Sequence, residues 1–158
     1  MTKRFGLAAA LLIAMTGIAH AKTQHTDWMS DKKSDGRCVA FSSPQSNDGV
    51  INGRSAPYIT VMNSPKEGIR GAISFVSGSE STGLEAVKVA IDGKEFEVLP
   101  FKGAAFAASG KPEAAVLSAM RKGHSLAITW TTNDGQSVTD TYSLAGFSAA
   151  HTAIENCR

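Results

Sequence analysis

The chain has 158 residues, of which 42% are hydrophobic, and it carries 16 Lys and Arg against 14 Asp and Glu. This length suits one domain with a substantial core. Proteins that bind nucleic acid cluster an excess of Lys and Arg, and a chain so close to neutral argues against nucleic acid as a partner.

The first residues have the three parts of a secretory signal peptide. Lys3 and Arg4 form a positive start, an apolar run covers residues 5–19, and Ala19 and Ala21 are the small residues that a signal peptidase reads. The apolar run is shorter than the roughly 20 residues that a membrane span needs. A secretory segment that is cleaved is therefore the better interpretation.

We accordingly predict a signal peptide at residues 1–21 and one domain at residues 22–158. Removal of Lys3 and Arg4 leaves 14 basic against 14 acidic side chains, so the mature protein is expected to be neutral. No later apolar run has the length of a transmembrane segment. The predicted location is the periplasm, and secretion or surface association are further outcomes of export.

The first half of the domain predicts strands that are separated by loops. Residues 22–36 are polar around one apolar anchor, Trp28, and predict a loosely structured segment or an edge strand. SNDGVINGRSAP at 46–57 and SGSESTG at 77–83 are rich in turn-forming residues and predict exposed loops. Strands are favoured, by β-branched content or by alternating apolar residues, at residues 38–41, 58–63 and 69–75.

Two hairpins give the clearest structural signal. In each, apolar and polar residues alternate on both sides of a turn, which is Asp92-Gly93 in the first hairpin and residues 133–135 (Asn-Asp-Gly) in the second. The apolar positions of the two hairpins predict a set of mostly buried side chains, namely Val89, Ile91, Phe96, Val98, Leu126, Ile128, Trp130 and Tyr142.

Two short helices are expected. The segment KPEAAVLSAMRKG, residues 111–123, has Pro112 in its first turn and Gly123 as its stop. Ser148 is a candidate cap for a final helix at residues 149–155. About seven short strands with two small helices predict a mainly β fold, an antiparallel β-sandwich.

The last stretch, DTYSLAGFSAAHTAIENC, resembles the closing signature of the invasion-associated locus B family of bacterial exported proteins. The matching positions are Asp140, Thr141, Tyr142, Ser143, Leu144, Gly146, Phe147, Ala150 and Cys157. Upstream, RCVAFSSP at 37–44 is similar to the family's early cysteine segment. VKVAIDGKEFEVLPF resembles its central hairpin and AAVLSAMRKG its helix, so the resemblance spans Trp28 to Cys157 in order.

The resemblance implies an immunoglobulin-like β-sandwich, export to the periplasm or beyond, and no catalytic chemistry. The founding members of the family are associated with entry into host cells. One departure weakens the transfer of that role, because some members carry further cysteines around the segment that matches FKGAAFAASG. This chain has none there, so a second disulfide is excluded; the residues are Ala104, Ala105, Phe106 and Ala107.

The residues that carry catalysis or bind metals in other proteins do not form a recognisable pattern. Metal sites usually show local pairs such as His-x-x-x-His, and no such pair occurs among the histidines of the domain, His25, His124 and His151. Glu95 and Glu97 share one strand face and are interpreted as the solvated side of a hairpin. We therefore predict no enzyme, no catalytic residue, no metal site and no cofactor.

Two functions fit these observations. The first is a non-enzymatic interaction protein of the bacterial envelope or of host-cell contact, in line with the invasion and virulence association that the resemblance implies. The alternative is a periplasmic ligand-binding module with no role in invasion. The expected partner is a protein or envelope component, or a host-cell surface. Exposed loops at 43–57 and 77–83 would serve either function or only connect strands. A flat patch would favour the first function and a concave pocket the second.

The two cysteines, Cys38 and Cys157, are expected to form a disulfide in the exported protein. An oxidising compartment and an even cysteine count favour pairing. The bond would fasten the first well-formed strand to the last helix at a chain end that otherwise frays. Two free buried thiols and an intermolecular bridge are the alternatives.

Overall fold

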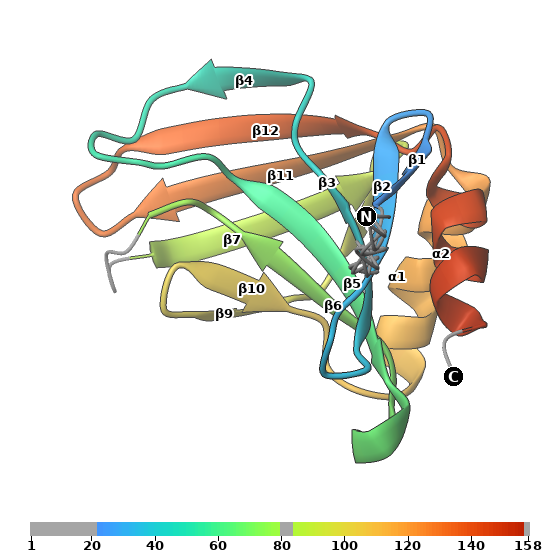
Figure 1. The fold of residues 1–158 in the computed structure, drawn as a ribbon. Coiled ribbons are helices and arrows are strands. Elements are labelled where there is room, and N and C mark those ends of the chain that lie inside the picture. Colours follow the sequence, from blue (N-terminus) through green and yellow to red (C-terminus); the bar gives the residue numbers. More distant parts are fainter. Residues whose placement is uncertain (1–21, 80–83, 157–158) are drawn as a thin grey trace, which may run out of the picture.

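The computed structural model describes residues 22–79 and 84–156, so the predicted signal peptide and Cys157 lie outside the described residues. The described chain forms two antiparallel sheets and two α-helices (Figure 1). The predicted mainly β sandwich with two short helices is thereby confirmed. No helix in the described ranges is long and apolar enough to cross a membrane.

The larger sheet has seven strands in the order β1-β2-β3-β5-β6-β10-β9, all paired antiparallel. The strands are β1 (Thr23–His25), β2 (Trp28–Lys32), β3 (Cys38–Ser42), β5 (Tyr58–Ser64), β6 (Ile69–Val76), β9 (Leu99–Phe101) and β10 (Ala104–Phe106). The predicted edge strand around residues 22–36 is the β1–β2 hairpin. A short 3-10 helix, η1 (Pro65–Glu67), connects β5 to β6.

The smaller sheet has five strands in the order β4-β12-β11-β7-β8. The strands are β4 (Ser46–Gly49), β7 (Leu84–Ile91), β8 (Lys94–Phe96), β11 (Ser125–Thr132) and β12 (Ser137–Ser143). Both predicted hairpins are present as β7–β8 and β11–β12. In the first, Asp92 and Gly93 have φ values of 47° and 82°, the left-handed pair that a two-residue hairpin turn requires.

The core lies between the inner faces of the two sheets, as expected for a sandwich. The large sheet contributes Val61, Ile73 and Phe75, and the small sheet contributes the predicted apolar positions of its two hairpins. Of the eight residues predicted to be mostly buried, Phe96 and Val98 are only partly buried. Phe96 lies on β8, an edge strand with a neighbour on one side only, and Val98 lies in the connection between β8 and β9.

The two helices pack side by side at one end of the sandwich (Figure 1). α1 (Lys111–Lys122) contacts β6, and α2 (Phe147–Glu155) contacts β1, β2, β3 and β5. They cover the part of the large sheet's inner face that the small sheet leaves open. The prediction that Ser148 caps α2 is wrong. The cap position is Gly146, and the Ser148 hydroxyl donates instead to the carbonyl of Arg121 at 3.0 Å.

Two segments that were predicted as loops, or given no strand, form strands. Residues 46–49 of the predicted loop form β4, which pairs with β12 through its backbone, so its polar side chains gave no sign of it. Residues 99–106 form the β9–β10 hairpin. The loop predicted at 77–83 is wrong at its first residue, because Ser77 is fully buried. Residues 80–83 of that loop lie outside the described residues.

Candidate functional site

The three histidines predicted to form no site lie in separate parts of the domain. His25 Nε2 is 2.8 Å from Ser30 Oγ, and His124 is exposed beside Asp92. His151 lies on α2 and contacts Arg121 of α1. Within residues 22–79 and 84–156, no group of three or more His, Cys, Asp or Glu side chains could hold a metal ion.

The carboxylate pair Glu95 and Glu97 lies in solvent, as its interpretation as a solvated strand face required. Both side chains are exposed at the rim of a groove of about 540 Å³ between β7, β8 and β9. The wall of the groove is mostly apolar, with Val87, Val89, Phe96, Val98 and Leu99, and Lys88 completes its lining.

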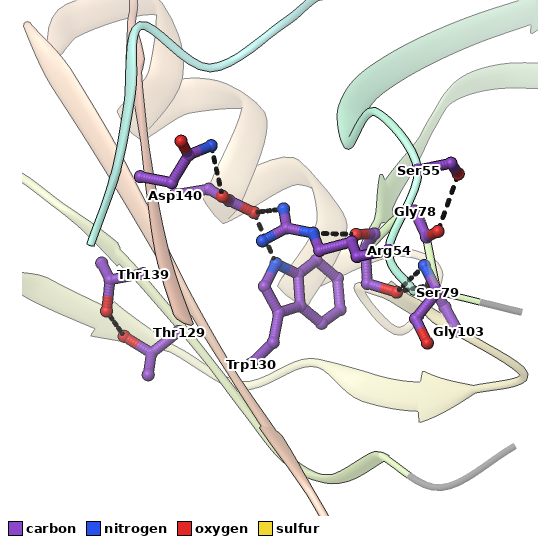
Figure 2. Close-up of polar contacts among 11 residues, drawn as sticks. Arg54, Ser55, Gly78, Ser79, Gly103, Thr129, Trp130, Thr139 and Asp140 are labelled. Carbon is purple, nitrogen blue, oxygen red and sulfur yellow. Dashed lines mark hydrogen bonds and ion pairs between the residues drawn. The ribbon is translucent and has the colours of Figure 1, made fainter. Parts of the chain in front are cut away.

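A charged network is buried at the end of the sandwich opposite the helices (Figure 2). Asp140 lies on the inner face of β12 with no exposed surface, and its Oδ2 forms an ion pair with the Arg54 guanidinium. Trp130 Nε1 donates to the same oxygen at 2.9 Å, and Asn47 Nδ2 donates to Oδ1 at 3.4 Å. A carboxylate taken out of water is stable only with such partners.

Arg54 also connects the network to the large sheet. It stands in the segment between β4 and β5, and its Nε donates to the carbonyl of Ser77 at the end of β6 at 2.5 Å. The Ser77 hydroxyl in turn donates to the carbonyl of Gly103 in the β9–β10 turn at 2.6 Å (Figure 2). One guanidinium therefore bridges Asp140 of the small sheet and Ser77 of the large sheet. The sequence singled out Asp140 but gave no signal for Arg54.

The outward side of the large sheet is unusually apolar. Alternate residues of a strand point to opposite faces, and the strand registers align two outward rows across β9, β10, β6 and β5. The rows alternate with residues that are buried in the core, such as Ala105, Phe75 and Ile59. The first row is Phe101, Ala104, Val76 and Tyr58, and the second is Leu99, Phe106, Ser74 and Thr60.

The described chain exposes five large hydrophobic side chains, and four of them stand in these two rows. Leu99 and Phe101 are 62% and 61% exposed, and Tyr58 and Phe106 are 42% and 38% exposed; the fifth is Val50, near β4. We call the surface formed by Tyr58, Val76, Leu99, Phe101 and Phe106 the outer apolar face. The sequence did not reveal it, because the β9–β10 hairpin was not predicted.

Comparison with known proteins gives a match to the family model of the invasion associated locus B (IalB) protein, over residues 26–155. The chain belongs to the invasion associated locus B family. A crystal structure of invasion associated protein b from Bartonella henselae is similar in fold, with a TM-score of 0.53 at 14% identity. That match covers 85% of this chain and 96% of the other. The curated proteins contain no match.

Several residues of the closing signature have clear structural roles in this IalB chain. Gly146 has a φ of 90°, and an added Cβ would lie 1.8 Å from the carbonyl oxygen of His25, so only glycine fits. Phe147 then packs edge-on against Trp28 with ring centroids 4.7 Å apart. Trp28 Nε1 donates to the carbonyl of Ser143 at 2.9 Å. The signature thus docks α2 on β1 and β2, while its first residue holds Arg54.

The strand that carries Cys38 lies next to the end of α2. Cys38 is buried at the start of β3 and pairs in register with Asn63 of β5. Asn63 Nδ2 donates to the carbonyl of Ile154, in the last turn of α2, at 2.8 Å. The end of α2 therefore lies beside the strand pair that carries Cys38.

His151 joins the two helices as a neutral acceptor. Its ring is buried, and an Arg121 guanidinium nitrogen lies 2.7 Å from Nδ1. The same nitrogen donates to Glu155 Oε2 at 2.7 Å, and Nε2 has no hydrogen-bond partner among the described residues. Burial, and then the charge of Arg121, lower the pKa of His151, while Glu155 opposes the shift.

This geometry predicts a loss of stability as the pH falls from 7.5 to 5.5. In the unfolded chain, His151 takes up a proton near the ordinary histidine pKa of about 6.5. In the folded chain it takes up that proton only at a lower pH. The unfolded state therefore binds more protons in this pH range. Urea unfolding at several pH values should show a falling free energy of unfolding, and His151→Gln should flatten that dependence.

His124→Gln is the matched control for this prediction, because the His124 side chain is 94% exposed. It should leave the pH dependence as it is in the parent protein. The pKa values of Asp35, Asp92 and Asp134 are lowered from the ordinary value of 3.8, so these carboxylates take up protons below the pH range of this experiment. Equal slopes for the parent and His151→Gln would contradict the assignment.

Proposed function

We propose that this protein is an exported, non-enzymatic interaction protein that acts at the bacterial envelope or in host-cell contact. The observation that carries the proposal is the outer apolar face. Soluble proteins rarely expose contiguous apolar patches of more than a few hundred Å², and larger ones mark interaction sites. Membership of the invasion associated locus B family supports the same function.

The way the chain uses its buried ionisable groups is consistent with this proposal. Asp140 is held by Arg54 and Trp130, and His151 by Arg121. Each of these contacts ties one structural element to another, and none is directed into the groove between β7 and β9. Among the described residues, these buried groups therefore hold elements of the fold together.

The groove favours the alternative, a periplasmic ligand-binding module. Its volume of about 540 Å³ lies in the range of small-molecule sites, and most of its wall is apolar. The polar side chains of its lining are Lys88, Glu95 and Glu97, and a ligand site needs such groups to orient its ligand. The outer apolar face holds four of the five exposed large hydrophobic side chains of the described residues, and for that reason the interaction function is the better supported.

Export to the periplasm, with secretion or surface association as further destinations, is part of the proposal and includes a disulfide between Cys38 and Cys157. Cys157 lies outside the described residues, three positions after Ile154, whose carbonyl is bonded to the register partner of Cys38. Three residues span at most about 10 Å, and disulfide-bonded Cα atoms are usually about 4–7 Å apart. The position of α2 therefore supports the pairing.

We expect protein isolated from the periplasmic fraction to have both cysteines in one intramolecular bond. In the loop-entropy model, closing a loop of about 100 residues stabilises the fold by roughly 4.7 kcal/mol. Alkylation followed by non-reducing mass spectrometry measures this directly. A linked Cys38–Cys157 peptide pair with no alkylated cysteine is the expected result. Alkylation of both thiols without prior reduction, or a bond between two chains, would show that the proposed pairing is wrong.

The interaction function is tested by capture from detergent extracts of bacterial envelopes and host-cell membranes. Four immobilised proteins are compared by quantitative mass spectrometry: the parent, Phe101→Ser on the outer apolar face, Phe96→Ala in the groove, and a control variant. We expect components that are enriched by the parent and by Phe96→Ala but not by Phe101→Ser. Val50→Ser is the control, because Val50 is 67% exposed away from the face.

Other results would decide against this function. Enrichment that is lost with Phe96→Ala and kept with Phe101→Ser would favour the ligand-binding alternative at the groove. Equal recovery by all four proteins would mean that neither surface binds a partner.

A further inference from the structure

We propose that the outer apolar face docks the protein peripherally on an anionic phospholipid bilayer. This inference rests on the interaction function proposed above and names the class of partner. Three properties of the described residues lead to it, which are the extent of the apolar strip, the sign of the charges around it, and the structure of the sheet edge beside it.

The apolar strip extends well beyond the two hairpin strands. The second outward row continues from Thr60 to Phe41 of β3 and Met29 of β2, both of which are partly exposed. Six neighbouring strands about 4.8 Å apart make the strip roughly 24 Å wide. An antiparallel sheet with one face in water normally places polar residues on that face. Ser74 and Thr60 are the polar members of this row, and the rest of it suits a partner surface that is apolar and broad.

A lysine lies against an aromatic ring near each end of the strip. Lys102, in the β9–β10 turn, has its Nζ 5.3 Å from the ring centroid of Phe101. At the other end, Lys22 Nζ lies 5.7 Å from the ring centroid of Phe41. Each lysine therefore lies against an aromatic ring of the strip, with its ammonium group free to reach phosphate oxygens beside that ring.

The described strands of the large sheet contain one acidic residue, Asp31. Its carboxylate is 2.6 Å from Lys33 Nζ and its side chain is only 8% exposed. The nearest carboxylates to β9 in the sequence, Glu95 and Glu97, line the groove that Leu99 also lines.

Asp27 is exposed in the hollow that Met29 and Phe41 also line, near Lys22. Lys102 forms no ion pair with another described residue, and the apolar surface beside it complements a bilayer of anionic lipids.

The edge of the sheet argues against pairing with another strand. β9 has only three residues, and the middle one is Pro100, which has no backbone N–H to donate. Short edge strands and edge prolines are devices that block strand addition. A second copy packed on the same face would bring one cationic border towards another, because a two-fold interface uses the same patch on both chains. A bilayer neither adds a strand at β9 nor brings a second cationic border to the face.

The test is co-sedimentation with lipid vesicles. Vesicles that contain phosphatidylglycerol are compared with vesicles of phosphatidylcholine alone, at low salt and at 0.5 M NaCl, a concentration at which exposed charges are strongly screened. We expect binding to the anionic vesicles that weakens with salt. Every variant is expressed from the same full chain, so the amino-terminal segment contributes equally to all of them.

Two variants address the two properties of the strip. Leu99→Ser/Phe101→Ser removes its two most exposed apolar side chains and should weaken binding at least tenfold, given the free energy of burying such side chains. Lys102→Glu should weaken it by roughly fivefold or more, since one cation near an anionic surface contributes about that factor.

Matched controls lie on the other sheet. Lys94 Nζ is also 5.3 Å from an aromatic centroid, that of Phe96, so Lys94→Glu reproduces the charge change away from the strip. Val50→Ser reproduces the loss of an exposed apolar side chain. Both should bind like the parent. Hydrogen exchange of the parent protein, which needs no variant, should show protection at residues 99–106 when anionic vesicles are added.

Several outcomes would overturn the inference. They are no binding to anionic vesicles, equal binding by the parent and the strip variants, or self-association that Leu99→Ser/Phe101→Ser abolishes without any vesicle binding. The result also separates this inference from the proposed function. Capture of a protein that depends on Phe101, together with no vesicle binding, would leave the interaction function standing and remove the bilayer as its partner.

Discussion

The buried ion pair between Arg54 and Asp140 is the constraint on which the rest of the fold depends. A carboxylate with no solvent contact must be matched in charge and hydrogen bonding, because an unpaired buried charge costs several kcal/mol. Arg54 can pair with Asp140 only if the segment after β4 crosses from the small sheet to the large sheet beside Asp140. The second bond of Arg54, to the carbonyl of Ser77, fixes the end of β6. The same contact then sets where the β9–β10 turn lies, through Ser77 and Gly103.

The inner and outer sides of the large sheet consequently have different roles. Its inner side is fully occupied, by the small sheet at the Arg54 end and by α1 and α2 at the other. Ordered attachment at both ends leaves the outer side as the surface available for contact, and the side chains that stand there are largely apolar. Interior polar groups hold the two sheets together. The function that we propose uses the outer apolar face, which takes no part in the core.

The sequence predicted the elements in which the pattern of apolar and polar side chains indicates which residues are buried. The two hairpins and α1 were predicted because apolar alternation and turn residues such as Asp92-Gly93 depend on local structure. β4 was missed because its pairing uses only backbone groups, and the β9–β10 hairpin because three-residue strands carry no period. The outer apolar face was missed for a related reason, since it becomes continuous only when β9 and β10 are placed beside β6. Asp140 was recognised by resemblance alone, and its partner Arg54, 86 residues away in the sequence, had no local signal.

The most direct test of this account is a double-mutant cycle on the buried pair, measured by urea unfolding. Asp140→Asn and Arg54→Met should each lower the free energy of unfolding by about 3–5 kcal/mol, because each leaves one buried charge unpaired. The double variant should lose much less than the sum, since it removes both charges, and the exposed control Asp134→Asn should change stability by less than about 0.5 kcal/mol. Additive losses, or single losses no larger than that of the control, would contradict the claim that this ion pair joins the two sheets.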